Sequence, residues 1–114
     1  MVSFEKQVEE FLTAFPGTKQ LTEGGYQYFR IGNIILPSGC SPEKVSVLLC
    51  PQMREGYQSR LFLSQMVTGC PVRNWTMKNV RILESNWFSI SWQTNPGLTI
   101  KEMYYTHLKA FSNE

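Results

Sequence analysis

Cys70 is the side chain of this sequence best suited to covalent chemistry. It lies in a Gly-Cys-Pro turn after a strand-like segment, and a thiol on an exposed turn acts as a nucleophile once it is ionised. Arg73 and Lys78 are the cationic residues close enough in sequence to favour the thiolate. Cys70 is therefore the candidate catalytic residue, with an incidental loop thiol as the alternative interpretation.

The other residues that often serve in active sites are expected to be structural. Cys50 precedes Pro51 at the end of a strand-like segment, and we expect Cys50 and Cys40 to be small buried side chains. His107 is the only histidine, it lies beside the apolar stripe of a helical segment, and the chain contains no Asp. A Ser-His-Asp triad and a zinc or magnesium site are not indicated, and no cofactor is predicted.

Serine and tryptophan residues near the C-terminus raise a different possibility. Ser89 and Ser91 alternate with aromatic residues, which is typical of a half-exposed strand, and no base is evident that would activate either hydroxyl. Tryptophans often anchor protein interfaces, although a place in the core is the alternative for each of them. The candidate partner-binding residues, including two from the first helix, are Phe4, Val8, Trp75 and Trp87.

Length and charge narrow the possible functions. The 114 residues carry a net charge of +2 and fit a single domain over residues 1–114. The basic residues are scattered, whereas a nucleic-acid-binding face shows a basic stripe, so we expect no nucleic-acid partner. No apolar run reaches the roughly 18 residues of a membrane span, and the N-terminus lacks a signal-peptide pattern. The expectation is a cytoplasmic protein with reduced thiols and no membrane partner.

An amphipathic helix is expected near each end of the chain. The first has apolar residues at helical spacing, an N-cap at Ser3 and a stop at Pro16-Gly17. The second begins with a capping box, in which Thr99 and Glu102 satisfy each other's backbone donors. We expect both helices to pack against a core.

Strand patterns occupy the middle of the chain. They predict strands over 26–36, with an interruption near Gly32-Asn33, and over 44–49, 60–67, 79–83 and 87–92. Residues 18–25 are expected to form a loop. A run of strands without intervening helices predicts an α+β fold with an antiparallel sheet.

Several short motifs occur in the order found in one protein family. Glu23-Gly24-Gly25, Leu36-Pro37-Ser38-Gly39 and a strand ending at Cys50-Pro51 are followed by Gly56-Tyr57-Gln58, Trp87-Phe88-Ser89 and His107-Leu108. Together they resemble a bacterial ubiquitin-conjugating-enzyme-like (UBC-like) family, over roughly residues 8 to 111. The resemblance implies a UBC-like fold with an N-terminal helix, an antiparallel meander and a C-terminal helix.

The resemblance also implies partners and a reaction. Bacterial proteins of this kind are typically encoded with ThiF-like adenylating enzymes, ubiquitin-like proteins and JAB-type peptidases. Their pathway attaches ubiquitin-like proteins to targets, in some cases for phage defence. By this resemblance, Cys70 accepts the modifier as a thioester from an adenylating enzyme that docks on the first helix.

Departures from the family pattern leave two alternatives open. Cys70 lies only 13 positions after Tyr57, Gln58 replaces a proline, and the His-Pro-Asn flap of standard members is absent. One alternative is a catalytically inactive UBC-like protein that binds a ubiquitin-like protein or an adenylating enzyme through its sheet or its aromatic surface. The other is an unrelated α+β adaptor or chaperone.

Overall fold

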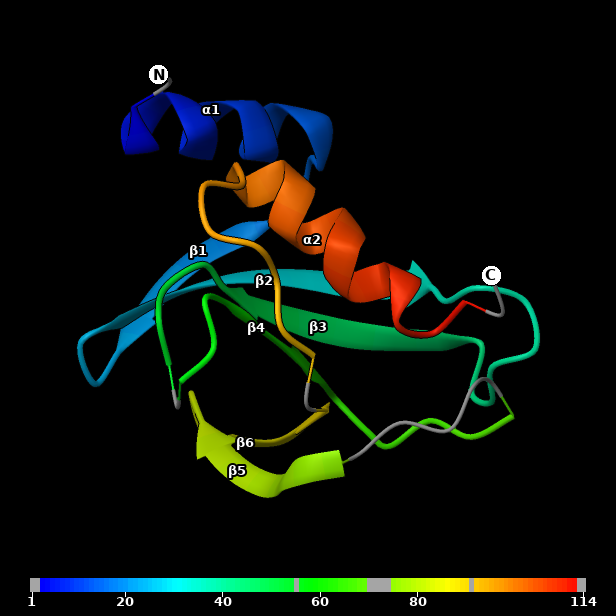
Figure 1. The fold of residues 1–114 in the computed structure, drawn as a ribbon. Helices are drawn as coiled ribbons and strands as arrows, with labels where there is room; N and C mark the ends of the chain where they lie inside the picture. The colour runs from blue at the N-terminus through cyan, green and yellow to red at the C-terminus, as the bar shows by residue number, and fades with distance from the viewer. Residues whose placement is uncertain (1–2, 55, 70–74, 91, 113–114) are drawn as a thin grey trace.

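The computed structural model describes residues 3–54, 56–69, 75–90 and 92–112 (Figure 1). Two helices flank six strands in the chain. In sequence order the elements are α1 (Phe4–Ala14), β1 (Lys19–Glu23), β2 (Tyr26–Ile35), β3 (Lys44–Cys50), β4 (Arg60–Leu63), β5 (Trp75–Ile82), β6 (Ser85–Ile90) and α2 (Ile100–Lys109). The predicted α+β class with an antiparallel sheet and a helix near each end is confirmed.

The six strands form one antiparallel sheet in the order β1-β2-β3-β4-β6-β5. The first four strands therefore follow one another as a meander, and β5 and β6 form a hairpin that joins through β6. The interruption predicted near Gly32-Asn33 is a register shift between Ile31 and Ile34, where Asn33 has a φ of 52°. Such a bulge bends the strand without ending its pairing.

Local capping fixes where the two helices begin. The Ser3 side chain accepts a hydrogen bond from the Lys6 amide at 3.2 Å, as the sequence predicts. At α2, the Thr99 amide donates to the Glu102 carboxylate at 2.9 Å, and the Glu102 amide donates to Thr99 Oγ1 at 3.2 Å. Hydrogen bonds from the backbone and then the side chain of Thr99 to the Glu102 carboxyl group lower the pKa of that group.

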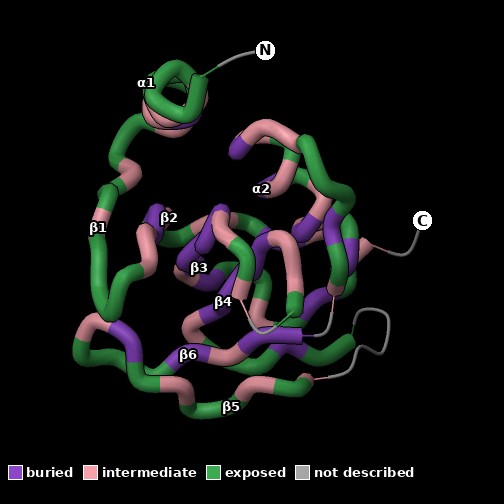
Figure 2. Tube along the Cα trace, turned by 60° about the vertical axis from the view of Figure 1, so that its left-hand side comes forward, coloured by how far each residue is buried: buried purple, intermediate pink, exposed green. Residues whose placement is uncertain are grey.

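Both helices pack on the same side of the sheet, which we call the helical face (Figure 1). Its core is apolar and includes Phe11 of α1, Tyr104 of α2 and alternate residues of the central strands. The Phe11 ring lies 5.3 Å from that of Phe29 and 5.6 Å from that of Tyr104, in edge-on contacts. Figure 2 shows the resulting layers, with β3 and β4 largely buried and β1 exposed along most of its length.

The opposite side of the sheet carries a second, smaller core beneath the β5–β6 hairpin. We call this side the hairpin face; its buried residues are Tyr28, Leu48, Cys50, Phe62, Ile82 and Trp87. The sheet curls enough for its two end turns to meet, because the Leu83 amide donates to the Glu23 carboxylate at 2.8 Å. Both faces of the central strands are therefore covered, and β3 is buried at five of its seven positions.

Some strand boundaries differ from the sequence-based expectations. Residues 18–25 were expected to form a loop, but Lys19–Glu23 pairs with β2 as an exposed edge strand. The Gly24-Gly25 turn, with φ values of 60° and 84°, has the left-handed backbone that a tight hairpin needs. β4 ends at Leu63, whereas the sequence predicted a strand up to Val67. β5 starts at Trp75 instead of Asn79, and β6 spans Ser85–Ile90 instead of residues 87–92.

Candidate functional site

Cys70, the candidate catalytic residue, lies outside the described residues. The chain is described up to Gly69, which has a φ of +82°. Just before it, Thr68 pairs with Ser41 in an isolated antiparallel bridge. The position from which the chain leads to Cys70 is therefore known, although the thiol itself is not described.

The other two cysteines are buried, as the sequence predicts. Cys40 donates a hydrogen bond from its thiol to the Phe111 carbonyl at 3.5 Å. Cys50 is fully buried on the hairpin face, and burial raises the pKa of its thiol. The raised pKa disfavours the Cys50 thiolate. Burial closes both thiols to a substrate, so neither residue is placed to act as a nucleophile.

A buried polar cluster links Ser59, which directly precedes β4, to the segment after β6 and to α2. Ser59 Oγ lies 2.8 Å from Thr94 Oγ1 and 2.9 Å from His107 Nε2. Only 4 % of the His107 surface is exposed, and burial, together with the Arg60 charge, lowers the pKa of His107 to about 4. The imidazole is neutral at pH 7 and closed to substrates, in keeping with the structural role expected for it.

Arg60 forms a second polar contact on the other face of β4. Its guanidinium donates to the Ser89 hydroxyl at 3.3 Å and to the Ile90 carbonyl at 2.9 Å, and it lies 4.4 Å from the centre of the Tyr57 ring. Ser89 is thereby buried, so the expectation of a half-exposed strand is wrong at this position. The alternation of serine with aromatic residues did not show that an arginine from β4 covers the serine.

Arg54 lies in an aromatic enclosure that the sequence did not reveal. Its guanidinium lies 4.4 Å from the ring centre of Tyr26 and 5.2 Å from that of Phe62, and it donates to the Tyr28 hydroxyl. A cation between aromatic faces is stabilised by the electron density of the rings. Because these rings come from two non-neighbouring strands, no local pattern could have identified the enclosure.

The four candidate partner-binding residues lie in different surroundings. Phe4 is 41 % exposed at the start of α1, whereas Val8 is half-buried against the helical-face core. Trp75 is half-buried at the start of β5, with its ring 6.2 Å from that of Phe111. Trp87 is only 2 % exposed and donates from Nε1 to the Ile82 carbonyl at 3.1 Å. Trp87 therefore belongs to the core, the alternative that the sequence left open, and a partner cannot reach its ring.

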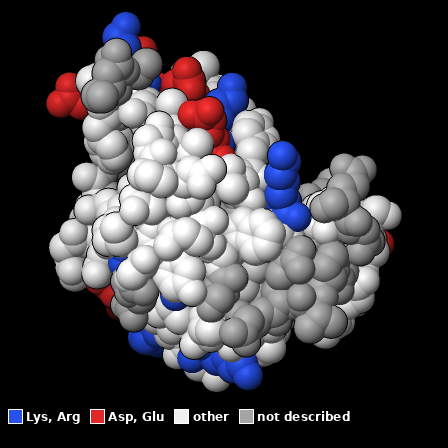
Figure 3. Space-filling model, in the orientation of Figure 1, with Lys and Arg blue, Asp and Glu red and all other residues white. Residues whose placement is uncertain are grey.

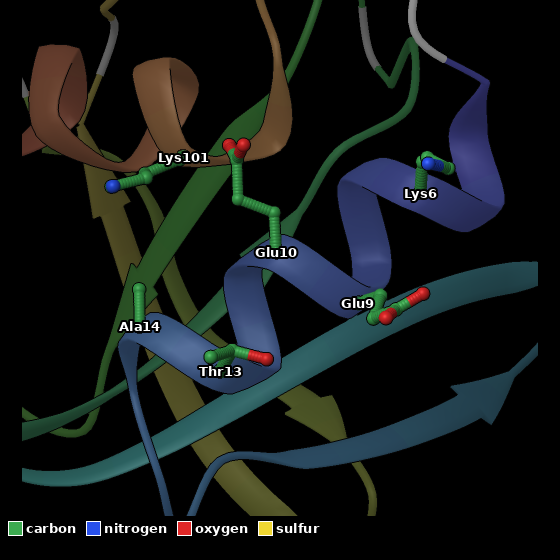
Figure 4. A pocket seen from close by; sticks show the side chains of 6 residues that line it. All are labelled: Lys6, Glu9, Glu10, Thr13, Ala14 and Lys101. Carbon is green, nitrogen blue, oxygen red and sulfur yellow. The ribbon is translucent and has the colours of Figure 1, made fainter.

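The outer surface of the two helices is charged. A shallow hollow of about 570 Å³ between them is lined by Lys6, Glu9, Glu10, Thr13 and Ala14 of α1 and by Lys101 of α2. Figure 4 shows Glu10 extending from α1 toward the start of α2, and Figure 3 shows that charged side chains gather here while much of the face below is uncharged. This composition suits a polar contact surface and not an enclosed pocket for a small apolar ligand.

Two classes of site were sought among the described residues. No three or more His, Cys or Glu side chains gather there where they could hold a metal ion. Neither helix is long and apolar enough to cross a bilayer. Compared with known proteins, the chain matches no protein family, no curated protein and no solved structure.

Proposed function

We propose that this chain is a UBC-like component of a bacterial ubiquitin-like protein conjugation pathway, and that Cys70 carries the modifier as a thioester. The observation that supports the proposal best is the arrangement of α1, the β1–β4 meander and α2. The four strands neighbour one another in chain order, and both helices pack on one side of them. This is the order of elements that the resemblance to the UBC-like family implies.

The burial of two cysteines supports the choice of the third. Cys40 and Cys50 are enclosed in the two cores, which leaves Cys70 as the thiol for transfer. In the proposed step, the Cys70 thiolate attacks the carbonyl carbon of the modifier's thioester on the adenylating enzyme. A new carbon–sulfur bond forms, the bond to the enzyme's sulfur breaks, and the departing thiolate takes up a proton from solvent.

The proposed partners are a ThiF-like adenylating enzyme and a ubiquitin-like protein. We place the enzyme's docking site on the outer surface of α1, around Phe4, by analogy with the family. The polar character of the neighbouring hollow, with Glu9 and Glu10, suits a reversible contact between proteins. Trp75, half-buried against the helical-face core, is the second aromatic candidate for a partner contact.

A catalytically inactive UBC-like protein is the second candidate function, and the buried polar cluster favours it. Ser59, Ser89 and His107 are all buried and bonded to other groups within the protein. None of these three side chains can assist a transfer at the surface. An inactive member of the family would bind the same partners without forming a covalent bond.

A charging assay separates the two candidates. The chain is incubated with the adenylating enzyme and the ubiquitin-like protein encoded beside it and with ATP, and adducts are resolved with and without reductant. A reductant-sensitive adduct that disappears in Cys70→Ser and persists in Cys50→Ala is the expected result. An adduct that persists in Cys70→Ser contradicts the assignment of Cys70.

Binding measured by calorimetry completes the test. If the adenylating enzyme becomes charged and binds this chain, but no adduct forms, the inactive candidate is correct. If neither an adduct nor binding is detected, both candidates are wrong.

A further inference from the structure

The strand β1 lies at one edge of the six-stranded sheet, next to β2 and to no other described strand. Four of its five residues are exposed, and Leu21 at its centre is half-buried. Figure 2 shows β1 along the outer margin of the molecule. An exposed edge strand offers its outward backbone amides and carbonyls to another strand. This edge is therefore open to pairing with a further chain.

The pairing with β2 fixes which backbone groups of β1 point outward. Thr22 lies opposite Gln27, and the Gln27 amide donates to the Gln52 side chain at 2.6 Å, so it is not directed at Thr22. Hydrogen-bonded and non-hydrogen-bonded pairs alternate along an antiparallel ladder. Gln20 and Thr22 therefore direct their backbone amides and carbonyls away from β2, toward the open side of the edge.

The sequence of β1, Lys19-Gln20-Leu21-Thr22-Glu23, is complementary to itself when two copies run antiparallel. If Leu21 lies opposite Leu21 of a second copy, Gln20 of each copy pairs with Thr22 of the other through the backbone groups that point outward. Lys19 of each copy then lies opposite Glu23 of the other, on the same face as Leu21, because side chains alternate along a strand. A two-fold axis at Leu21 thus forms both ion pairs at once.

The surroundings of the two charges favour this arrangement. Within the chain, Lys19 lies opposite Arg30 of β2, and like charges directly opposite one another destabilise a pair of strands. A carboxylate from a second copy would offset this repulsion. The Leu83 amide donates to one oxygen of the Glu23 carboxylate at 2.8 Å and orients it, and a carboxylate can accept several further hydrogen bonds.

We infer that β1 is the contact strand of a two-fold symmetric homodimer, in which the sheets of two copies join antiparallel at Leu21. The inference does not depend on the function proposed above, because it involves neither Cys70 nor an enzyme partner. Strands of five residues form a small contact with exposed ion pairs. The dimer therefore dissociates on dilution and weakens at high salt.

Sedimentation equilibrium of the full chain tests the inference. The apparent mass should rise from 13.2 kDa toward twice that value as the concentration increases, and the rise should be smaller at high salt. Lys19→Glu should raise the dissociation constant of the dimer at least about tenfold, because two carboxylates then face each other at both ends of the contact. Lys44→Glu, at an exposed position of the interior strand β3, changes the net charge equally and should leave the constant unchanged.

Mixing two charge-reversed variants tests the pairing of Lys19 with Glu23. Lys19→Glu and Glu23→Lys should each be weaker dimers than the wild type when alone. Their equimolar mixture places opposite charges at both ends of the contact and should restore the dimer. A loss of folding in either variant cannot produce this restoration. If the wild type dimerises and the mixture does not, the inferred pairing is wrong.

Oxidative cross-linking with diamide tests the position of the two-fold axis. A Cys70→Ser background leaves the buried Cys40 and Cys50. In it, Leu21→Cys places two thiols directly opposite each other, with Cα atoms about 4.5–5.5 Å apart, which a disulfide can span. The control Gln20→Cys places them on the diagonal, about 7–8 Å apart, and should cross-link at least about tenfold more slowly.

Two outcomes would overturn the inference. Equal cross-linking rates at positions 20 and 21 would show that the two copies do not meet in the inferred register. A wild-type chain that stays monomeric at every concentration would exclude the homodimer and leave the edge to an extended segment of a different protein.

Discussion

The two faces of the sheet are both covered, but by different kinds of contact. The helical face is packed with aliphatic and aromatic side chains, and it includes a buried polar cluster around His107. The hairpin face instead places three arginines beside aromatic rings: Arg30 beside Trp87, Arg54 within the Tyr and Phe enclosure, and Arg60 beside Tyr57. The same central strands thus support one core that depends on apolar packing and another in which arginine side chains lie beside aromatic rings.

This difference bears on how partners could bind. Burial of apolar surface is non-directional and tolerates small adjustments, whereas a cation between rings requires those rings at fixed distances. Because the hairpin covers its face of the sheet, partner binding through that surface would require the hairpin to move. The outer surface of α1 and the neighbourhood of Trp75 are accessible without such a change.

Truncating the centre of the helical face should have the largest effect on stability. Phe11 is fully buried and contacts the rings of Phe15, Phe29 and Tyr104. We expect Phe11→Ala to lower the free energy of unfolding by about 3–5 kcal/mol, measured by urea titration. The control Phe4→Ala, at a position 41 % exposed, should cost less than about 1 kcal/mol. Similar costs for the two variants would mean that α1 does not pack as described.

Acid should weaken the helical face through its one histidine. Since the pKa of His107 falls from 6.5 to about 4 on folding, the unfolded chain binds a proton more readily than the folded one between these values. The contribution of neutral His107 to the free energy of unfolding is therefore fully present above pH 6.5. It is lost as the pH falls through 4, by roughly 3 kcal/mol in total. Urea titrations at pH 7 and pH 4.5 measure this decline. The decline between these two pH values should be smaller in His107→Gln. If the decline is equal in both proteins, it comes from protonation of carboxylates and not of His107.

Removing a cation from the hairpin face should have an intermediate effect. Arg54→Met keeps an apolar stem but loses the ring contacts and the hydrogen bond to the Tyr28 hydroxyl. We expect the free energy of unfolding to fall by about 2 kcal/mol and the pKa of Tyr28, already raised by burial, to rise further because Arg54 lowers it. Arg81→Met, at an exposed position of β5, is the matched control and should change stability by no more than about 0.5 kcal/mol. A stabilising Arg54→Met would show that the cation is tolerated and not required.

The helix caps should contribute least, because they act outside both cores. Thr99→Ala removes the side-chain acceptor for the Glu102 amide and should cost about 1 kcal/mol in thermal or urea unfolding. Ser3→Ala at α1 provides a comparison of the same kind. A cost above about 2 kcal/mol for either variant would show that the cap also orders the core beneath it.

Features that depend on neighbours in sequence could be predicted, and those that depend on distant residues could not. The caps at Ser3 and Thr99 follow from side chains within three positions of the groups they bind. The edge strand β1 was missed because its polar, exposed residues lack the alternation of a half-buried strand. The enclosure of Arg54 and the burial of Ser89 were missed because their hydrogen-bond partners, Tyr28 and Leu61, lie 26 and 28 positions away.

The hydrogen bond between the Glu23 carboxylate and the Leu83 amide has a consequence for the order of folding. It joins groups 60 positions apart and ties the turn of the first hairpin to that of the last. Contacts of such long sequence separation form only after the entropy of closing the intervening chain has been overcome. We therefore expect the β1–β4 meander to form before the hairpin closes over it, so that Trp87 and the ring-enclosed arginines report a late stage of folding.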